Sequence, residues 1–267
     1  MTIKKQRKIS VITPSFNQAD FLRQTIESVI NQEGDFKIEY IVMDGGSTDH
    51  SVKVLQEYET KLKQSNLVDF IWHSEKDHGQ SDAINKGMRI ASGDIIAYIN
   101  SDDTYCAGAF DQVVKAFSDH PKSLWATGYC HIIDENGRLI SNLVTRYKNF
   151  WLKRYSYVTL QVLNYVCQPA TFWRREALDQ FGFFDESLHY TMDYDYWLKI
   201  GKVNRPVIIK QFLANFRIHS ASKGKTAYIK QFDQDYLSVK KYSSNSFLIF
   251  LHFVHNGLIK LAYRMTK

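Results

Sequence analysis

The first hundred residues alternate between short apolar runs and segments in which apolar side chains recur at three- and four-residue spacing. An uninterrupted apolar run is typical of a strand covered on both faces, and the longer spacing is typical of an amphipathic helix. The predicted strands are 8–13, 39–43, 68–73 and 95–99, and the predicted helices lie around 21–30, 52–58 and 83–91. We expect Gly93 to end the third helix. Strands that alternate with helices predict a parallel sheet with right-handed crossovers.

The pattern changes after Asp103. A helix around 113–117 is followed by apolar runs at 124–133 and 139–144 on either side of an Asp-Glu-Asn-Gly turn, which predicts a hairpin and therefore a mixed sheet. Residues 147–165 are aromatic and basic without a clear period, so we interpret them as a loop or short helix near the site. The remaining predictions are two short helices at 176–181 and 195–200 and a strand at 207–213.

The chain ends in an amphipathic segment. Residues 247–263 contain twelve apolar side chains, and four polar residues of the C-terminal segment fall four apart on one stripe of a helix, namely His252, Asn256, Lys260 and Arg264. The segment is short and interrupted compared with the roughly 20 apolar residues that cross a bilayer. Two interpretations stay open: a helix that docks on the body or on a second subunit, and a helix that lies at a membrane interface.

The formal net charge of +6 is unevenly distributed. From Lys199 onward there are 13 Lys and Arg against two Asp, a net charge of +11, whereas the remainder carries 21 basic and 26 acidic residues, a net charge of −5. A basic tail on an acidic body favours an anionic surface as partner. Because an apolar stripe accompanies the basic residues, an anionic membrane fits better, and no nucleic acid partner is expected.

Cysteine spacing and the start of the chain bear on the compartment. Cys106, Cys130 and Cys167 lie far apart, which argues against a zinc ribbon and against a disulfide framework. The apolar stretch near the start is too short for a signal peptide and stops at Pro14. We therefore expect a cytoplasmic protein whose tail allows peripheral attachment to the inner face of the membrane.

The stretch from Gly93 to Asp103 is the most informative. Its apolar strand ends in Asn100, Ser101, Asp102 and Asp103, and ligands of open α/β sheets bind at the carboxyl ends of strands. Two adjacent carboxylates repel each other unless a cation or hydrogen-bond donors lie between them. Mg²⁺ or Mn²⁺ with a phosphate as further ligand meets that requirement. The alternative is that Asp102 or Asp103 caps the helix that follows.

Further polar segments are expected at the same edge of the sheet. They are Pro14 to Asn17, Asp44 to Ser47 and His78 to Asp82. An Asp beside two glycines lets the backbone approach a flat ligand while the carboxylate accepts N–H bonds, such as those of a nucleobase imide. Each segment is also compatible with an ordinary turn, so a single one is weak evidence for a ligand site.

Five motifs, taken together, resemble glycosyltransferase family 2, inverting enzymes of the GT-A fold that use nucleotide sugars. They are VITPSFN, DGGSTD, GQSDAINKG, SGDIIAYINSDD and QPATFWRREALDQFGFFDESLHYTMDYDYWLKIG, within 9–219. The resemblance implies an α/β fold with a Rossmann-like mixed sheet flanked by helices over 1–222, followed by a basic helical extension over 223–267. It also implies a nucleotide-sugar donor, a UDP-sugar in our interpretation, and a glycan or lipid-linked saccharide acceptor in cell-surface polysaccharide synthesis.

The resemblance also implies roles for single residues. The implied donor-binding residues are Pro14, Ser15 and Asn17 at the nucleotide, Asp44 at the base, Gly79, Asp82 and Asn85 at the ribose and diphosphate, and Ser101. Asp102 matches the last acidic position of the family's metal motif, but Asn100 stands at the first, so the choice between Asp102 and Asp103 stays open. His219 matches a histidine near the diphosphate, where an imidazole suits Mn²⁺, with a structural histidine as the alternative.

The catalytic carboxylate is expected in HYTMDYDYWLKIG. Where the family usually has an acidic pair, this chain has Met192 followed by Asp193, so Asp193 matches the base. Asp195 is interpreted as a helix cap. Inversion needs one base to deprotonate the acceptor hydroxyl, so one carboxylate is sufficient.

Other classes of protein fit the sequence less well. A dehydrogenase would show G-x-G-x-x-G after the first strand, and a nucleotidyltransferase a glycine-rich basic loop, but residues 14–21 contain no glycine. The remaining alternative is a non-catalytic protein that binds a nucleotide sugar or a membrane partner, which Asn100 and the basic tail leave open. Consumption of donor only in the presence of acceptor would identify the enzyme.

Overall fold

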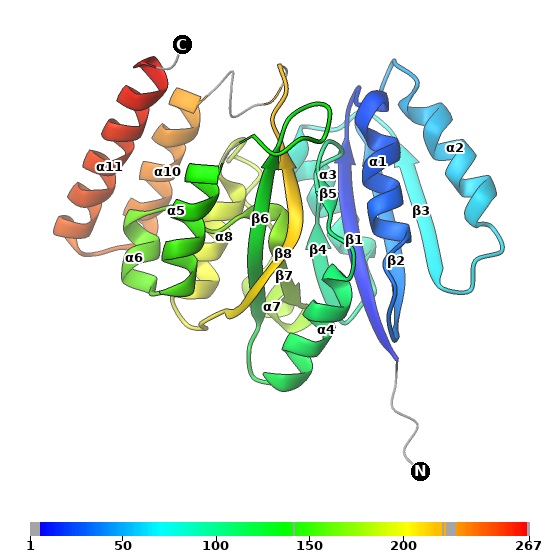
Figure 1. Ribbon diagram of the computed structural model, residues 1–267, viewed down its shortest axis with the longest axis horizontal. Helices are drawn as coiled ribbons and strands as arrows, with labels where there is room; N and C mark the ends of the chain where they lie inside the picture. The colour runs from blue at the N-terminus through cyan, green and yellow to red at the C-terminus, as the bar shows by residue number, and fades with distance from the viewer. Residues whose placement is uncertain (1–5, 141, 221, 223–227, 266–267) are drawn as a thin grey trace.

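The structure is a computed structural model and describes residues 6–140, 142–220, 222 and 228–265 (Figure 1). Its centre is an 8-stranded sheet with the strand order β3-β2-β1-β4-β7-β6-β8-β5. The strands are β1 Arg7–Ser15, β2 Phe36–Asp44, β3 Val68–Ser74, β4 Ile95–Tyr98, β5 Thr104–Tyr105, β6 Trp125–Ile133, β7 Thr171–Arg174 and β8 Val207–Arg217. The helices are α1 Ala19–Ile30, α2 Ser51–Leu62, α3 Gln80–Ile90, α4 Ala109–Asp119, α5 Asn142–Lys153, α6 Tyr157–Val162, α7 Arg175–Phe181, α8 Met192–Gly201, α10 Tyr228–Tyr242 and α11 Ser246–Met265, with a 3-10 turn η1 at Gln168–Ala170.

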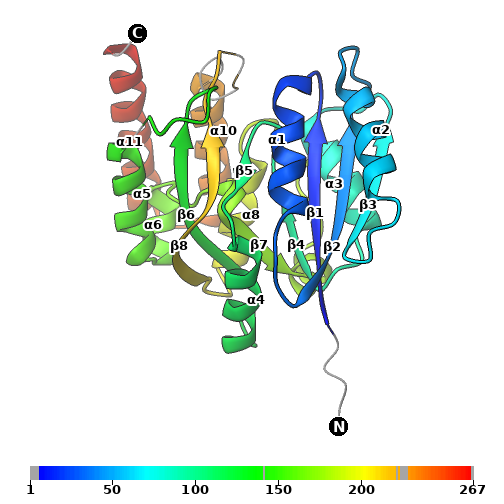
Figure 2. The same ribbon diagram turned by 45° about the vertical axis from the view of Figure 1, so that its right-hand side comes forward.

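The first four strands form the predicted parallel half of the sheet. β1 pairs in parallel with β2 and β4, and β2 with β3. Because successive side chains point to opposite faces, Val11 belongs to the core with α1, α2 and α4, whereas Ile12 belongs to the core with α3 and α8. Helices therefore cover both faces of the sheet. The carboxyl ends of β1 and β6 point toward the same edge (Figure 2).

The second half of the sheet is mixed, as predicted, but the predicted hairpin is present only as a short pairing beside the turn. Leu139 bridges Ile133 in antiparallel orientation, and the Ile140 N–H donates to the Ile132 carbonyl oxygen at 3.1 Å. The predicted second strand does not continue to 144, because α5 begins at Asn142. The turn itself is present, because the Asp134 carboxylate accepts the N–H groups of Asn136 and Arg138. β6 pairs instead with β7 in antiparallel and with β8 in parallel orientation. Both partners are distant in sequence, so local alternation could not reveal them.

Several smaller expectations need correction. Residues 147–165, interpreted as a loop or short helix, lie mainly in the two helices α5 and α6. Gly93 does not end α3, which stops at Ile90. A Cβ on Gly93 would approach the Ser10 backbone nitrogen to 2.7 Å, so glycine allows the close passage of two chain segments there. The short strands β5 and β7 were not predicted.

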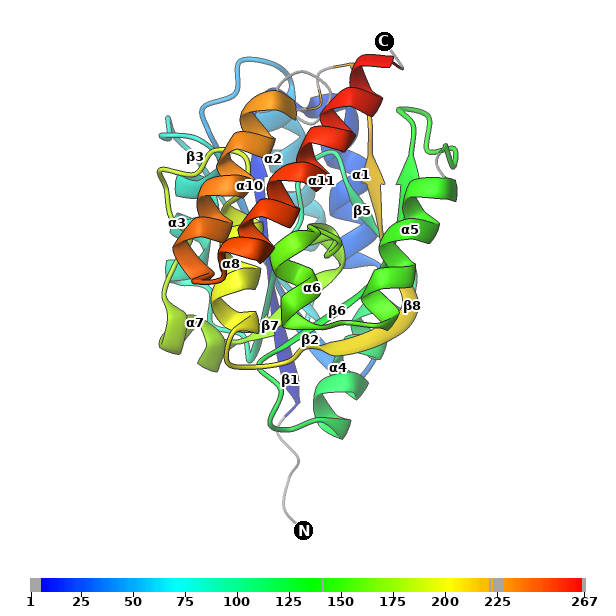
Figure 3. The same cartoon turned by 90° about the vertical axis from the view of Figure 1, so that its left-hand side faces the viewer.

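The chain ends in α10 and α11, which lie side by side and pack on α8 and α6 (Figure 3). Val239 of α10 is fully buried and belongs to the same core as Trp197 of α8. The predicted C-terminal helix is confirmed, and His252 and Asn256 of its polar stripe face inward, since both are buried. The domain boundary at 222/223 stays a prediction, because residues 223–227 lie outside the described residues.

Candidate active site

The loops at the carboxyl ends of β1, β2 and β4, together with the start of α3 and the end of β8, enclose a cleft of about 540 Å³. Five of the predicted donor and metal residues line it, namely Pro14, Ser15, Gly79, Ser101 and Asp102. The sheet topology explains this convergence, because the carboxyl ends of parallel strands meet at one edge. The other predicted residues lie around the cleft rather than in its lining, and their contacts show what each one holds.

Asp44 holds the loop after β2. Its buried carboxylate accepts hydrogen bonds from the N–H and hydroxyl of Ser47 and from the hydroxyl of Ser74 at 2.7 Å. Gly45 lines the cleft, and a Cβ at this position would come within 2.6 Å of a carboxylate oxygen of Asp77. Gly46 has a positive φ of 80°, which favours glycine. The approach of a flat ligand to this loop stays a prediction.

Asn17 joins the loops that follow β1 and β2. Its backbone N–H donates to the Ser47 hydroxyl at 2.8 Å, and its side-chain oxygen accepts the Thr48 N–H at 2.8 Å. Asn17 has a φ of 52°, a left-handed conformation that Asn tolerates better than most residues. These contacts fix the shape of the cleft at the side where Pro14 and Ser15 lie.

The residues predicted from the segment around α3 divide into two groups. Gly79 lies at the N-terminus of α3 and in the cleft, and its N–H donates to Asp77 at 2.8 Å. Asp82 instead accepts the His78 N–H at 3.0 Å. Asn85 is buried and bonded to residues 184 and 186, so it fastens the segment that precedes α8 to α3.

Asp102 and Asp103 point in different directions. The Asp102 carboxylate lies 2.9 Å from Nε2 of His219 and lines the cleft. Asp103 is fully buried and accepts the Arg217 N–H at 2.8 Å and the Asn100 amide at 3.3 Å. Burial and then the charge of Asp102 raise the pKa of Asp103 well above its usual range. The cap alternative is wrong for both residues, because α4 begins at Ala109 after Gly108.

The contacts of Asp102 and His219 are compatible with a divalent cation. Among the residues that the structure describes, no cluster of three or more His, Cys, Asp or Glu side chains could hold a metal by itself. A carboxylate oxygen and an imidazole nitrogen that already face each other supply two ligands of the type that Mn²⁺ accepts. Such ions commonly take their other ligands from substrate phosphates and water. A metal that binds together with a diphosphate therefore fits these residues.

Asp193 lies in the first turn of α8 and is partly exposed. Burial raises the pKa of its carboxyl, which the Tyr194 N–H and the positive charge of Lys148 oppose. The charges of Asp193 and Asp103 both act on Tyr98, the last residue of β4. Asp102 lines the cleft, whereas Asp193 does not belong to its lining.

The prediction that Asp195 caps a helix is wrong. Asp195 lies inside the first turn of α8, where its buried carboxylate contacts Lys241 Nζ at 3.2 Å and the Tyr242 hydroxyl at 3.0 Å. Both partners belong to α10, so Asp195 holds the C-terminal helices to the body. It is a structural residue, although for a different reason than expected.

The sequence interpretation missed several lining residues, namely Lys76, Asp77 and Arg217, and gave no role to Phe16 and Gln80, which lie inside the recognised segments. Asp77 directly precedes the segment His78 to Asp82, so extending that segment by one residue would have found it. No sequence motif marked Arg217. In the structure its guanidinium donates to the carbonyl oxygens of Asp102, Asp134 and Glu135 and so holds their loops together. The backbone N–H of Arg217 also donates to the Asp103 carboxylate.

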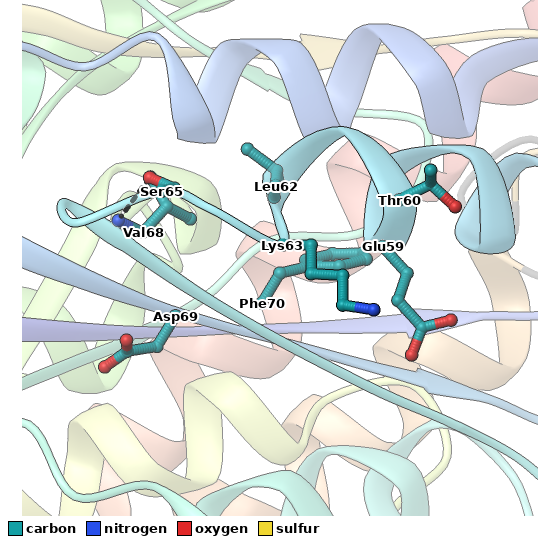
Figure 4. A pocket seen from close by; sticks show the side chains of 8 residues that line it. All are labelled: Glu59, Thr60, Leu62, Lys63, Ser65, Val68, Asp69 and Phe70. Carbon is teal, nitrogen blue, oxygen red and sulfur yellow. Dashed lines mark hydrogen bonds between the residues drawn. The ribbon is translucent and has the colours of Figure 1, made fainter.

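A second hollow lies far from the motifs, between the end of α2 and β3 (Figure 4). Its lining includes Glu59, Lys63 and Asp69, and the Asp69 carboxylate forms an ion pair with Lys8 at 3.0 Å. None of the predicted site residues lies there. The cleft at the strand ends is therefore the candidate active site.

Comparisons with known proteins bear on the family and on the fold. The family model described as "Glycosyl transferase family 2" matches residues 10–182. An uncharacterized glycosyltransferase of Rickettsia typhi is 26% identical over 97% of this chain and 84% of its own length. The mannosyltransferase PcManGT from Pyrobaculum calidifontis, solved in complex with GDP-Man and Mn²⁺, is 16% identical with a TM-score of 0.70 over 95% of this chain and 70% of that chain. S. aureus TarS 1-349, solved in complex with UDP-GlcNAc, is 16% identical with a TM-score of 0.65 over 91% of this chain and 69% of that chain. At such identities these structures show a shared fold, and the expected fold is confirmed.

Proposed function

The chain belongs to glycosyltransferase family 2 and is a nucleotide-sugar-dependent glycosyltransferase of the GT-A fold, and from this premise we propose that it is an inverting enzyme. In our proposal it moves the sugar of a UDP-sugar to a hydroxyl group of a glycan or lipid-linked acceptor in cell-surface polysaccharide synthesis. The observation that carries the proposal is the cleft at the carboxyl ends of the strands, which Asp102 lines and Asp193 does not. The donors named for the two solved relatives, UDP-GlcNAc and GDP-Man, support the donor class.

The proposed reaction uses the two parts of the site separately. Gly45, Gly79 and Asp102 place the nucleotide and diphosphate in the cleft. Asp193 takes the proton of the acceptor hydroxyl while that oxygen bonds to the anomeric carbon, and the bond from that carbon to the diphosphate breaks on the opposite side. A divalent ion held by Asp102 and His219 would neutralise charge on the departing diphosphate. No covalent intermediate is required, so a single base suffices.

Turnover distinguishes the enzyme from a binding protein. Common nucleotide sugars are offered with and without lipid extracts or glycan acceptors, and release of nucleoside diphosphate is measured. We expect release to depend on the acceptor, because hydrolysis by water is not the proposed reaction. Donor binding without turnover for every acceptor would instead favour the non-catalytic alternative that Asn100 leaves open.

Removal of divalent cations should weaken donor binding and stop transfer. The cleft places the Asp102 carboxylate where a diphosphate is proposed to bind, and like charges repel unless a cation lies between them. The measurement is calorimetric binding of a nucleotide sugar and transfer in excess chelator, followed by addition of Mn²⁺ or Mg²⁺. Full activity in excess chelator would contradict the metal assignment.

The outer face of α11 supports the proposal of membrane attachment. Several of its apolar side chains are more than half exposed, namely Phe247, Phe250, Phe253, Leu258 and Leu261. α5 extends this face, because the Tyr147 hydroxyl bonds to His255 of α11 at 3.0 Å and Leu143 is 80% exposed (Figure 3). No helix in the described part of the chain is long and apolar enough to cross a bilayer. We call the exposed apolar side chains of α5 and α11 the α5–α11 face.

The exposed cations beside the α5–α11 face do not come mainly from the basic tail, as the sequence had suggested. Lys241 and Lys260 are engaged in ion pairs with Asp195 and Asp233, and the side chain of Arg264 lies outside the described residues. Exposed cations come instead from Arg146 and Lys153 of α5, from Arg154 directly after α5, and from Lys240 of α10. Apolar side chains flanked by Lys and Arg match the headgroup region of an anionic bilayer. We propose that this surface holds the enzyme at the cytoplasmic face of the membrane, near a lipid-linked acceptor.

Flotation with vesicles tests membrane attachment. We expect the full chain to float with phosphatidylglycerol-containing vesicles and to float less as salt screens the cations. Replacing Phe247, Phe250 and Phe253 together by Ser should reduce vesicle binding roughly 10-fold or more, because each exposed Phe contributes apolar burial. The matched control is Leu67→Ser with Val203→Ser, two equally exposed apolar residues elsewhere. Equal flotation of the triple Phe→Ser variant and the control variant, or a stable dimer that does not float, would contradict membrane attachment.

A further inference from the structure

Two amide side chains meet in the lining of the candidate active site. Nε2 of Gln80, the first residue of α3, donates to Oδ1 of Asn100, which follows β4, at 2.6 Å. Both residues line the cleft. This direct bond between side chains 20 residues apart ties the start of α3 to the turn that carries Asp102 and Asp103. We call the contact between Gln80 and Asn100 the amide bridge.

The other end of the Asn100 amide faces Asp103. Its Nδ2 donates to the Asp103 carboxylate at 3.3 Å, and the backbone N–H of Asp103 donates to the Asn100 carbonyl oxygen at 3.1 Å. The same carboxylate accepts the Arg217 N–H at 2.8 Å, and Nε of Arg217 donates to the Asp102 carbonyl oxygen at 2.7 Å. A chain of hydrogen bonds therefore runs from α3 through Asn100 and Asp103 to the end of β8, two residues before His219.

The order of donors and acceptors in this chain of bonds requires an amide at position 100. An amide both accepts and donates, whereas an ionised carboxylate only accepts. A carboxylate at this position could still accept the Gln80 N–H, but it would oppose the acceptor oxygen of Asp103 and add a like charge beside Asp102. The departure from an acidic residue at the first position of the metal motif therefore has a physical reason.

We propose that Asn100 and Gln80 are positioning residues for the donor and that neither is a ligand of the divalent ion. The inference rests on the proposed binding of a diphosphate and a divalent ion in the cleft. Each partner of the amide bridge is one or two residues from a residue that is proposed to place the diphosphate, namely Gly79 and Asp102. The amide bridge therefore sets the distance between these two contacts, and the side-chain ligands of the ion are Asp102 and His219.

Side-chain amide NMR of the free protein tests the amide bridge without donor, metal or transfer. Nitrogen-15 spectra of the wild type, Gln80→Ala and Asn100→Ala assign the two NH2 groups. We expect one Gln80 amide proton to resonate downfield of those of Asn66, an exposed asparagine, because a short hydrogen bond deshields the proton. In Asn100→Ala this resonance should move upfield. A Gln80 resonance that Asn100→Ala leaves in place would overturn the amide bridge.

Nucleotide affinity tests the positioning role, with UDP and GDP, each with Mn²⁺, as calorimetric probes. We expect Asn100→Asp to weaken binding roughly 10-fold, because it loses the N–H donor to Asp103 and gains a like charge. The double variant Asn100→Asp with Asp103→Asn exchanges the donor and the acceptor, so the bond between the two positions can form again and most of the lost affinity should return. Asn66→Asp is the matched control, because it adds the same charge at an exposed position outside the cleft.

Transfer kinetics distinguish the amide bridge from the proposed base. Asn100→Asp should raise the KM for the donor and the Mn²⁺ concentration required more than it changes kcat, whereas Asp193→Asn should lower kcat. A loss confined to kcat in Asn100→Asp would contradict the positioning role.

The remaining outcomes separate this inference from the proposed function. If Asn100→Asp binds nucleotide and Mn²⁺ as tightly as the wild type or more tightly, position 100 does not need an amide and the positioning role is wrong. If Asn100→Asp does not fold, Gln80→Ala and Asn100→Ala take its place. Both break the same bond, so the double variant should lose no more affinity than Asn100→Ala alone, and additive losses would exclude the bridge as their cause. If the wild type binds neither nucleotide, the proposed function fails, and the NMR shift of Gln80 still decides whether the amide bridge exists.

Discussion

Asp193→Asn is expected to lower transfer by roughly 100-fold or more while leaving the affinity for the nucleotide sugar nearly unchanged. The substitution keeps the shape of the side chain and removes its basicity. Asp193 lies outside the lining of the donor cleft, so the variant should lose the chemical step and keep the binding step. Calorimetric donor binding and initial transfer rates measure the two effects.

The pH dependence of the wild type follows from the same residue. A general base acts only when ionised, and burial raises the pKa of Asp193 above the ordinary range of an aspartate. Transfer should therefore fall as the pH drops through this raised pKa, at a higher pH than an exposed aspartate would give. Asp193→Asn should lose this acid limb along with the rate.

Asp195→Asn is the control, because Asp195 is two residues away on the same helix. It gives up a charged contact with Lys241, which is half exposed, and keeps a possible bond to Tyr242, so we expect a loss of about 1 to 2 kcal/mol in the free energy of unfolding. Its transfer rate should stay close to that of the wild type. If Asp195→Asn were inactive and Asp193→Asn were active but unstable, the catalytic carboxylate would be Asp195, and the position assigned to it in the motif would be wrong by two residues.

The sequence predicted the place of the site because the place depends on topology. Short apolar strands separated by helices must align in parallel, and their carboxyl ends then meet at one edge. Pro14, Ser15, Gly79, Ser101 and Asp102 line the cleft for that reason. No side-chain detail was needed to predict this convergence.

The sequence could not decide between neighbours that the fold turns in different directions. Asp102 and Asp103 are adjacent and chemically identical, and only the backbone of Arg217, more than a hundred residues away, turns Asp103 into a buried acceptor. Asp44 and Asn85, predicted to contact the donor, do not line the cleft, and their bonds hold loops. Whether they also contact the donor stays a prediction.

The other misinterpretations have a common cause in long-range contacts. Residues 139–144 are apolar and follow a turn, which is the local pattern of a hairpin, yet β8 takes the place beside β6 and leaves this segment free to begin α5. The contact of Asp195 with Lys241 and Tyr242 likewise arises only when α10 packs on α8, and no local pattern encodes it.

Asp102→Ala should reduce transfer by roughly 10²- to 10³-fold, the range for loss of one group that stabilises charge developing on the leaving side. Unlike Asp193→Asn, this variant should also bind the nucleotide sugar more weakly and lose its response to Mn²⁺, because Asp102 with His219 is the proposed ligand pair. Donor titrations with and without Mn²⁺, together with transfer rates, separate the binding defect from the chemical one.

Asp103→Asn is the matched control for Asp102→Ala and decides which neighbour binds the ion. The amide oxygen of Asn can still accept the Arg217 N–H, so the turn should keep its shape. Because Asp103 is fully buried with a raised pKa, replacing it by a neutral side chain removes little charge from the cleft. We therefore expect the Mn²⁺ response and donor affinity to persist in Asp103→Asn. The opposite result, in which Asp103→Asn loses the Mn²⁺ response and Asp102→Ala keeps it, would mean that the turn rearranges when donor and metal bind and brings Asp103 into the cleft.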